Sequence, residues 1–313
     1  MGIASNRTHD TGSRHLRGSA VGAGLLAILI GVGLCWVLAT PAGPEAVAIP
    51  AGVALGAAVL LVGLGALPQI GPEPSTAIIG VAGGLWLGAS LVAAWIRTAE
   101  RAGEAPRSVT VNQFIDSVSS GAAEPISVIA ALLVVVFAFV ALTGRATPPV
   151  LTVAILAAIG ILATSIAGHP GQRTWGPLLV GTHALAAAWW CGTLAAMIVT
   201  VRGRRGWASV LPAFSARAVW AVAVIAVTGV IAGLVEVGGP GALVSTGYGR
   251  VLLAKLIGLA ALIALGARHR RRWVPRASRH QVTDEQSIRI AATELALMAV
   301  VLGLAVGLST TAP

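Results

Sequence analysis

The sequence predicts an all-α protein, a polytopic bundle of about nine helices that crosses a membrane. Of its 313 residues, 56% are hydrophobic and only 10% are charged, whereas a typical soluble domain has about 25% charged residues. The mean hydropathy is +0.88. The apolar residues also form long uncharged blocks, and about 20 such residues suffice to cross the ~30 Å hydrocarbon core of a bilayer. A soluble globular protein is therefore excluded.

Nine apolar blocks are candidates for the membrane-spanning helices. They cover residues 20–40, 46–67, 76–96, 122–143, 147–167, 176–201, 214–238, 249–269 and 288–309. We expect residues 1–167 to form an N-terminal region of five helices and residues 168–313 to form a second region of four. The longest connection, residues 98–121, carries scattered apolar residues such as Phe114 and Ile115. This segment is either an interfacial segment or an ordinary loop.

The formal net charge of +10 does not indicate nucleic-acid binding, because the basic residues are segregated into short connections between apolar blocks. Such segregation sets membrane orientation, with the basic connections in the cytoplasm. If the N-terminus is cytoplasmic, the outer connections hold only four arginines, Arg97, Arg101, Arg107 and Arg173. The inner segments then hold Arg7, Arg14, Arg17, Arg145, Arg202, Arg204, Arg205, Arg268, Arg270, Arg271, Arg272, Arg276 and Arg279. We therefore expect a cytoplasmic N-terminus and, after nine crossings, a C-terminus outside.

Ionisable residues inside the apolar blocks are candidate functional residues, because a charge in lipid is costly. His183, Glu236 and Lys255 fall in the outer third of three consecutive helices, at depths of ~10, ~3 and ~9 Å. We expect them to line a polar vestibule that opens to the outside. The alternative is that Lys255 extends to the surface and pairs with Glu236. Glu294 falls in the inner third, as a packing carboxylate or part of a gate.

Candidate metal ligands are few. His169 and His183 both fall towards the outer side, and imidazole binds copper, zinc and iron; a membrane histidine is also commonly an interhelical hydrogen-bonding group. The softer ligands Cys191 and Met197 lie ~12 and ~21 Å below His183 on the same helix. Free cysteine commonly behaves as a small buried hydrophobic residue, and both Cys35 and Cys191 are also consistent with that role. No nucleotide-binding, metalloprotease or catalytic-triad pattern occurs, so we do not expect an enzyme.

Five motifs follow one another from residue 168 to the end of the chain. They are Gly168-His169, the segment Thr182–Leu194 (THALAAAWWCGTL), Phe214-Ser215 followed by Thr228-Gly229, the segment Thr246–Lys255 (TGYGRVLLAK), and Glu294-Leu295 with the ending Ser309–Pro313. In this order they resemble the CopD family of bacterial copper-resistance and copper-uptake membrane proteins. One departure is Gly192-Thr193, where the family has Gly-Gly. Because Thr is small, we expect close helix packing to survive there.

The resemblance implies a multi-pass protein of the bacterial cytoplasmic membrane that binds copper at its outer face and moves it into or across the membrane. Cu(I) is the form that thiol and thioether ligands favour. The implied metal ligands are His169, His183, Cys191 and Met197, and the polar vestibule comprises Glu236, Tyr248, Arg250 and Lys255. The implied partners are a soluble copper-binding protein outside the membrane and the cytochrome oxidase assembly machinery.

Two alternatives remain open. His169 and His183 are fourteen residues apart, a spacing at which membrane cytochromes place haem ligands on one helix, although Pro170 and Pro177 interrupt a continuous helix between them. A haem-binding membrane cytochrome is the first alternative. The second is a non-transporting structural or assembly subunit whose polar residues stabilise helix contacts.

Overall fold

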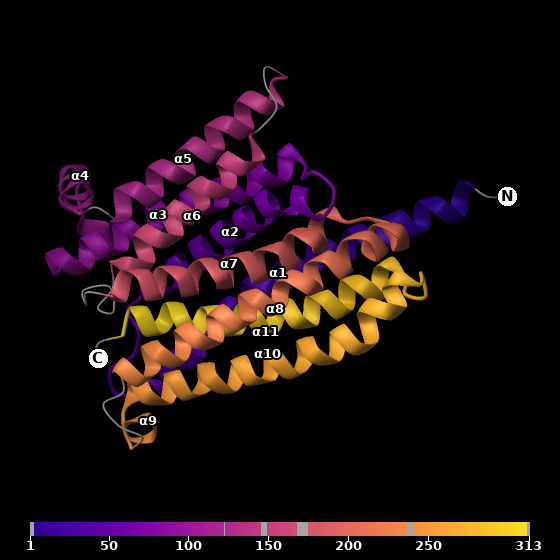
Figure 1. Cartoon of the computed structure of the whole chain (residues 1–313). Coiled ribbons are helices and arrows are strands. Elements are labelled where there is room, and N and C mark those ends of the chain that lie inside the picture. The colour runs from indigo at the N-terminus through magenta and orange to yellow at the C-terminus, as the bar shows by residue number, and fades with distance from the viewer. Residues whose placement is uncertain (1–2, 122, 145–148, 168–174, 237–240, 312–313) are drawn as a thin grey trace.

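The computed structural model describes residues 3–121, 123–144, 149–167, 175–236 and 241–311 (Figure 1). Within these ranges the chain is helical and has no strand, which confirms the predicted fold class. Eight of the described helices are long and apolar enough to cross a membrane. The apolar block at 147–167 forms a shorter helix of 17 residues. At 1.5 Å per residue this helix is ~25 Å long, slightly less than the ~30 Å core of a typical bilayer.

The long helices agree with the nine apolar blocks but extend beyond several of them. They are α1 (Ile3–Leu38), α2 (Ala48–Ala66), α3 (Thr76–Ala102), α5 (Ala123–Leu142), α6 (Val150–Ile166), α7 (Gly176–Thr200), α8 (Gly203–Glu236), α10 (Gly247–Ser278) and α11 (Asp284–Ser309). The short elements are η1 (Leu67–Gln69), η2 (Pro106–Ser108), α4 (Val111–Ser120) and α9 (Ala242–Ser245). Hydropathy detects only the apolar part of a helix, whereas backbone hydrogen bonding continues into polar turns.

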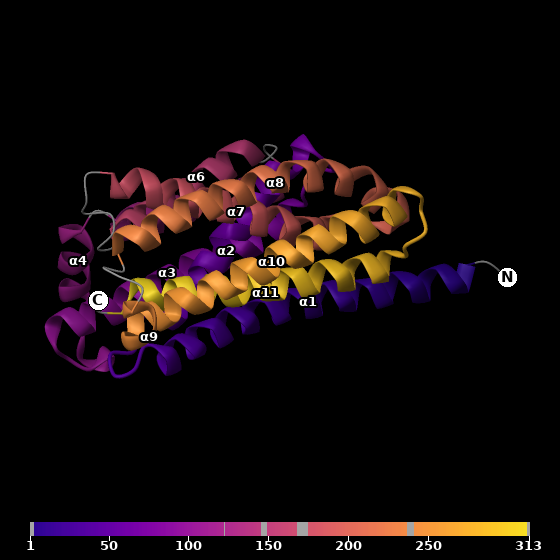
Figure 2. The same cartoon turned by 60° about the horizontal axis from the view of Figure 1, so that its bottom comes forward.

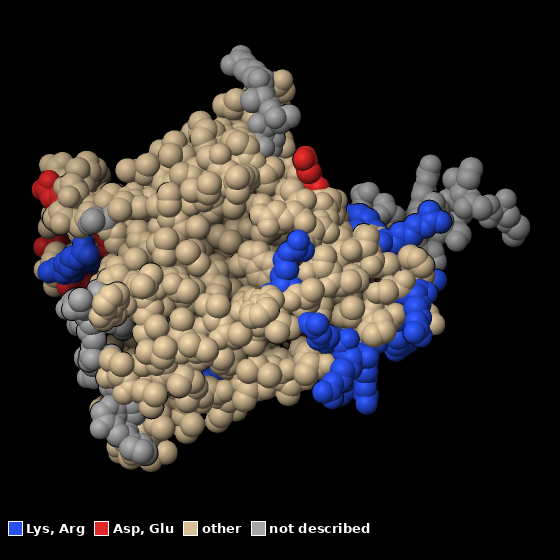
Figure 3. Space-filling view, viewed as in Figure 1, with Lys and Arg blue, Asp and Glu red and all other residues tan. Residues whose placement is uncertain are grey.

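Successive long helices run in alternating directions, and the two termini lie at opposite ends of the bundle (Figures 1 and 2). The visible Lys and Arg side chains gather mainly towards the end where the N-terminus lies, while the lateral face between the two ends carries few charges (Figure 3). We call this end the basic end. The distribution is the one that positive-inside orientation requires, and the assignment of the basic end to the cytoplasm stays a prediction.

Helices from the two predicted regions pack against each other. The N-terminal helix α1 lies along the last helix, α11, and α2 lies against α7. One large apolar cluster contains buried residues from both regions, including Leu61 and Trp86 from the first and Leu194 and Met298 from the second. The boundary at residue 167 stays a prediction, and the two regions share one core.

Two glycine contacts bring these helices together. A Cβ atom at Gly63 of α2 would overlap the backbone of Gly192 of α7, and a Cβ at Gly31 of α1 would overlap the backbone of α11 near Gly303. Only glycine permits such close approach, which is a common way to pack helices in lipid. The residue after Gly192 is Thr193, and its side chain is completely buried. The close packing expected at Gly192-Thr193 is therefore present.

At the basic end, one carboxylate joins three helices. Asp284, the first residue of α11, has Oδ2 2.7 Å from Nη2 of Arg17 on α1. Its Oδ1 accepts hydrogen bonds from the indole of Trp207 at 2.8 Å and from the backbone N–H of Gly203 at 3.1 Å, both on α8. Arg17 also donates to the carbonyl of Ile198 on α7. The sequence places Arg17 in a basic segment and gives no indication of this network.

The connection at 98–121 contains the amphipathic helix α4, which lies across the end of the bundle opposite the basic end (Figure 2). A capping box between Thr110 and Gln113 starts it. Phe114 packs on Trp95 of α3 with ring centroids 5.3 Å apart, whereas Val111 and Ile115 are 63% and 56% exposed. An exposed apolar strip on a short helix at this position is consistent with the interfacial alternative.

Candidate functional site

The half of the bundle away from the basic end contains a hydrogen bond between His183 of α7 and Thr228 of α8. Nδ1 of His183 lies 2.9 Å from Oγ1 of Thr228. The same Oγ1 lies 2.6 Å from the carbonyl oxygen of Val224, one turn earlier on α8. A Cβ atom at Gly229 would lie 3.3 Å from Cε1 of His183, so the imidazole packs directly against the backbone of α8.

These contacts assign the protons of the histidine. The Thr228 hydroxyl donates its single proton to the carbonyl of Val224, which leaves the oxygen to accept from Nδ1–H of His183. The neutral imidazole then has its lone pair on Nε2. The imidazole also interacts with the backbone of Ile225 on α8, so two groups of the same helix hold its ring. This is the arrangement of a metal-ligating histidine, whose second nitrogen is fixed by another group.

Two further groups lie in the same half of the bundle, away from the basic end. Lys255 of α10 acts electrostatically on both His183 and Cys35 of α1. In the described part of the chain, Lys255 has neither a hydrogen bond nor an ion pair. Cys35 is completely buried, and its Sγ lies 3.9 Å from Oγ1 of Thr311. Lys255 thus lies within electrostatic range of the predicted His183 and of Cys35, which the sequence indicates only as a buried hydrophobic residue.

The other predicted vestibule residues are placed differently. Arg250 hydrogen-bonds the carbonyl oxygens of Leu38 at 2.8 Å and Thr40 at 2.6 Å, so it fastens the end of α1 to the start of α10. Tyr248 is half-buried in the first turn of α10. Glu236 is the last residue of α8, and its side chain lies outside the described residues. The predicted pairing of Lys255 with Glu236 therefore stays a prediction.

The predicted softer ligands lie deeper in α7. Cys191 is 5% exposed and Met197 is completely buried in the main apolar cluster. His169 lies outside the described residues. Among the described residues, no group of three or more His, Cys, Asp or Glu side chains is close enough to hold a metal ion. The candidate ligands are thus spread along α7 and do not form one closed site there.

The structure pairs Glu294 with a residue that sequence analysis missed. Nδ1 of His269 on α10 lies 2.5 Å from Oε2 of Glu294 on α11, and their side chains are 15% and 6% exposed. The His269 ring also packs edge-on against Trp273, with ring centroids 5.6 Å apart. His269 stands between Arg268 and Arg270, so the sequence indicated only a basic connection. The one feature of the sequence that could have indicated this pair is the position of His269 at the end of the apolar block 249–269.

Comparison with known families bears directly on this half of the bundle. Residues 208–308 match the family model of CopD, copper resistance protein D. We call residues 208–308 the CopD region, after the family that they match. It spans α8 from its second turn, together with α9, α10 and nearly all of α11. The suspected resemblance is thereby confirmed over about a third of the chain, and it links the protein to copper resistance in a multi-pass membrane setting. Searches of curated proteins and of solved structures gave no significant match.

The CopD match divides the candidate residues. Thr228, Lys255, His269 and Glu294 lie inside the matched segment, as do the vestibule residues Glu236, Tyr248 and Arg250. The metal-ligand candidates His169, His183, Cys191 and Met197 lie before it. His183 is nevertheless joined to the CopD region, because its hydrogen-bonding partner is Thr228.

Proposed function

We propose that this protein receives copper at the end of the bundle opposite the basic end and passes it into or across the cytoplasmic membrane. The observation that carries this proposal is the contact of His183 with Thr228, which fixes Nδ1 of the imidazole; we infer that Nε2 is the nitrogen that binds copper. The CopD match, in which Thr228 lies, supports copper as the cargo. Imidazole is a suitable ligand for copper, and a fixed tautomer raises its affinity.

The remaining donors are suited to transfer. Cys191 and Met197 follow His183 down the same helix, and they are soft ligands that favour Cu(I). Separated ligands hold an ion less tightly than a closed three- or four-ligand site, which favours release to the next ligand. Lys255 disfavours the accumulation of positive charge near His183. We infer that it limits occupancy of the outer part to one cation at a time.

The first experiment is metal analysis of the detergent-purified chain after copper loading under reducing conditions. Wild type is compared with His183→Ala and with the control His15→Ala, which removes an exposed histidine at the basic end. We expect His183→Ala to lose about one copper per chain and His15→Ala to lose none. Copper contents equal in all three proteins, together with equal copper-dependent growth of cells producing them, would contradict the proposal.

A soluble copper-binding protein outside the membrane is the partner that this proposal requires, because free copper is scarce and must be delivered. Supply of copper to cytochrome oxidase assembly is the finer function that we propose for the released ion. It is tested by oxidase activity in cells lacking the chain, with and without added copper. Restoration of activity by added copper supports this role, and oxidase activity that is unchanged by the deletion argues against it.

The two alternative functions have separate readouts. The helix that carries His183 begins at Gly176, and His169 lies outside the described residues, so the haem alternative needs a test in solution. An absorption spectrum of the purified protein without a Soret band removes the haem alternative. If the protein is a structural or assembly subunit, deleting it should lower the amounts of its partner proteins. The variant His183→Ala should then leave those amounts unchanged.

A further inference from the structure

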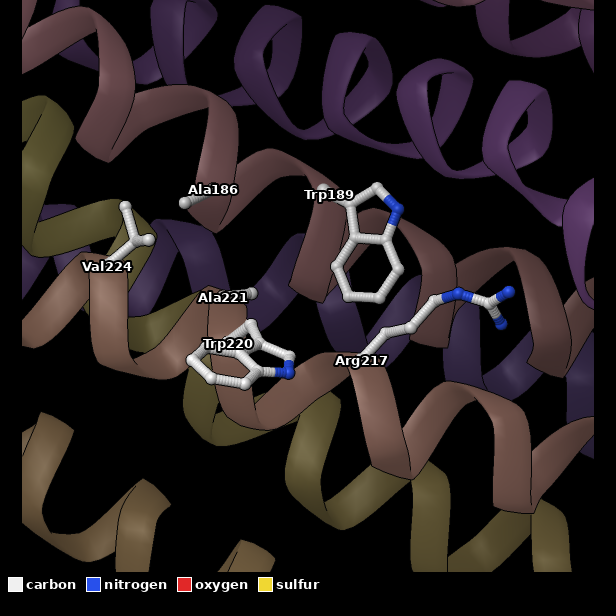
Figure 4. A pocket seen from close by; sticks show the side chains of 6 residues that line it. All are labelled: Ala186, Trp189, Arg217, Trp220, Ala221 and Val224. Atoms are coloured by element: carbon white, nitrogen blue, oxygen red, sulfur yellow. The ribbon is translucent and has the colours of Figure 1, made fainter.

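A groove opens on the lateral surface between α7 and α8. Its volume is about 320 Å³. Its lining residues are Ala186, Trp189, Arg217, Trp220, Ala221 and Val224 (Figure 4). The two small residues Ala186 and Ala221 leave space between the two indoles, and Arg217 is the only charged residue among those that line the groove. This surface has no role in the proposed handling of copper.

The position of Arg217 along α8 places it at a membrane boundary. The next ionisable residue is Glu236, and the 18 residues between them are uncharged. At 1.5 Å per residue this stretch is ~27 Å long, close to the ~30 Å hydrocarbon core. Arg217 therefore lies at the level of lipid headgroups, on the side of the basic end, where α8 begins. Residues one and two turns further along α8 lie in hydrocarbon.

The polar atoms of the groove lie towards one end of it. In Figure 4 the guanidinium of Arg217 lies at the right, the indole nitrogens of Trp189 and Trp220 each lie on the side of their ring nearer to it, and Ala186 and Val224 lie at the left. Trp220 is 75% exposed, so this surface faces lipid. The hydrogen bond from Arg217 to its own helix, at the carbonyl of Ala213, is long at 3.5 Å. Among the residues that the structure describes, the other guanidinium donors of Arg217 have no partner, so they can bind a ligand.

A second guanidinium lies near the same turn of α8. Nη1 of Arg270 on α10 donates to the carbonyl of Ser215 at 3.0 Å. No Asp or Glu is among the residues that line the groove. Guanidinium groups bind phosphate through paired hydrogen bonds, and tryptophan is favoured at the level of the glycerol and headgroup. The charge is therefore complementary to an anionic headgroup, and the apolar end of the groove is complementary to an acyl chain.

We propose that this groove binds one anionic phospholipid from the leaflet at the basic end. The lipid phosphate accepts hydrogen bonds from Arg217, and the two indole N–H groups face the glycerol esters. An acyl chain runs past Ala221 towards Val224. The ligand class is a phosphodiester lipid with a net negative charge, for which phosphatidylglycerol is a suitable probe.

The test is lipid binding to the full chain in neutral detergent, followed by native mass spectrometry. Phosphatidylglycerol, phosphatidylcholine and inorganic phosphate are titrated separately. We expect one tightly bound phosphatidylglycerol on wild type and a loss of affinity of about ten-fold in Arg217→Gln, because a charge-assisted hydrogen bond is removed. The control Arg272→Gln removes an exposed arginine of α10 outside the groove, and its affinity should stay within about two-fold of wild type.

A second variant tests the apolar end without changing the charge. Ala221→Leu fills the groove and should also weaken phosphatidylglycerol binding, while thermal unfolding shows that the variant is folded. Equal binding by wild type, Arg217→Gln and Ala221→Leu would overturn the proposal. So would equal losses in Arg217→Gln and Arg272→Gln, which indicate only general charge attraction. Binding of phosphatidylcholine as tight as that of phosphatidylglycerol overturns the anionic preference, and saturation by inorganic phosphate alone overturns the lipid as ligand.

Discussion

Nδ1 of His183 lies 2.9 Å from Oγ1 of Thr228, and this contact joins the helix of the metal-ligand candidates to the CopD region. Thr228→Val removes the oxygen that fixes the imidazole and keeps the size of the side chain. We expect copper affinity to fall by about 10–100-fold, the usual effect of losing a group that orients a metal-ligating histidine. Competition with a Cu(I) chelator measures it. Thr228→Ser retains the hydroxyl and should retain most of the affinity, and equal affinity in both variants would contradict the assigned tautomer.

We expect the buried pair of His269 and Glu294 to stabilise the folded protein. Glu294→Ala leaves the imidazole without its partner and should lower the free energy of unfolding by about 3–5 kcal/mol, as for other broken buried pairs. Thermal unfolding in detergent measures this loss. The double variant His269→Leu with Glu294→Leu removes both polar groups and should recover much of the stability. If the double variant is as unstable as the sum of the two single variants, the pair is not coupled.

Close helix contact at Gly192 predicts a strong effect of one added methyl group. Gly192→Ala places a Cβ against the backbone of Val59 on α2, so the two helices must separate. We expect a loss of about 1–3 kcal/mol, typical of overpacking, seen as a lower unfolding temperature. Gly84→Ala is the matched control, because nothing lies within 4 Å of a Cβ at Gly84. A similar loss in both variants would point to a general helix effect.

The contacts of Asp284 predict that it holds the basic end closed. Asp284→Ala removes the partner of the buried Arg17 and the acceptor of Trp207 and Gly203. We expect faster amide hydrogen exchange where α7 joins α8, with a stability loss of about 3–5 kcal/mol. Glu285→Ala is the control, since Glu285 also lies in the first turn of α11. Unchanged exchange in Asp284→Ala would show that the ion pair is dispensable.

The orientation predicted from the arginines can be tested with cysteine labelling. Both native cysteines are buried, Cys35 completely and Cys191 at 5% exposure, so background labelling by a membrane-impermeant maleimide should be low. We expect Glu104→Cys, between α3 and α4, to be labelled in intact cells, and Arg204→Cys, at the start of α8, to be labelled only after permeabilisation. The reverse result would invert the topology and place the His183 part of the bundle towards the cytoplasm.

The sequence alone determined the class of this protein and the number of its apolar segments. An uncharged block of about 20 residues crosses lipid as a helix, because a helix satisfies its own backbone hydrogen bonds. His183, Lys255 and Glu294 were found by the same reasoning, since ionisable groups in lipid are costly. The motifs that resemble the CopD family can also be identified from the sequence, because each is a short segment and they follow one another along the chain.

Only the tertiary structure decided which helices are neighbours and which polar groups meet. The pairing of α1 with α11 depends on the close approach of Gly31 and Gly303. These two residues are far apart in the chain, and nothing in the spacing of the glycines indicates which helices will pair. The sequence predicts Arg250 as a vestibule residue, and only the structure shows that it binds the backbone at the end of α1. The sequence around His269 indicates only a basic segment, whereas the structure shows that His269 pairs with Glu294. Hydropathy measures the cost of placing a residue in lipid, whereas the partner that offsets this cost is set by packing between distant segments.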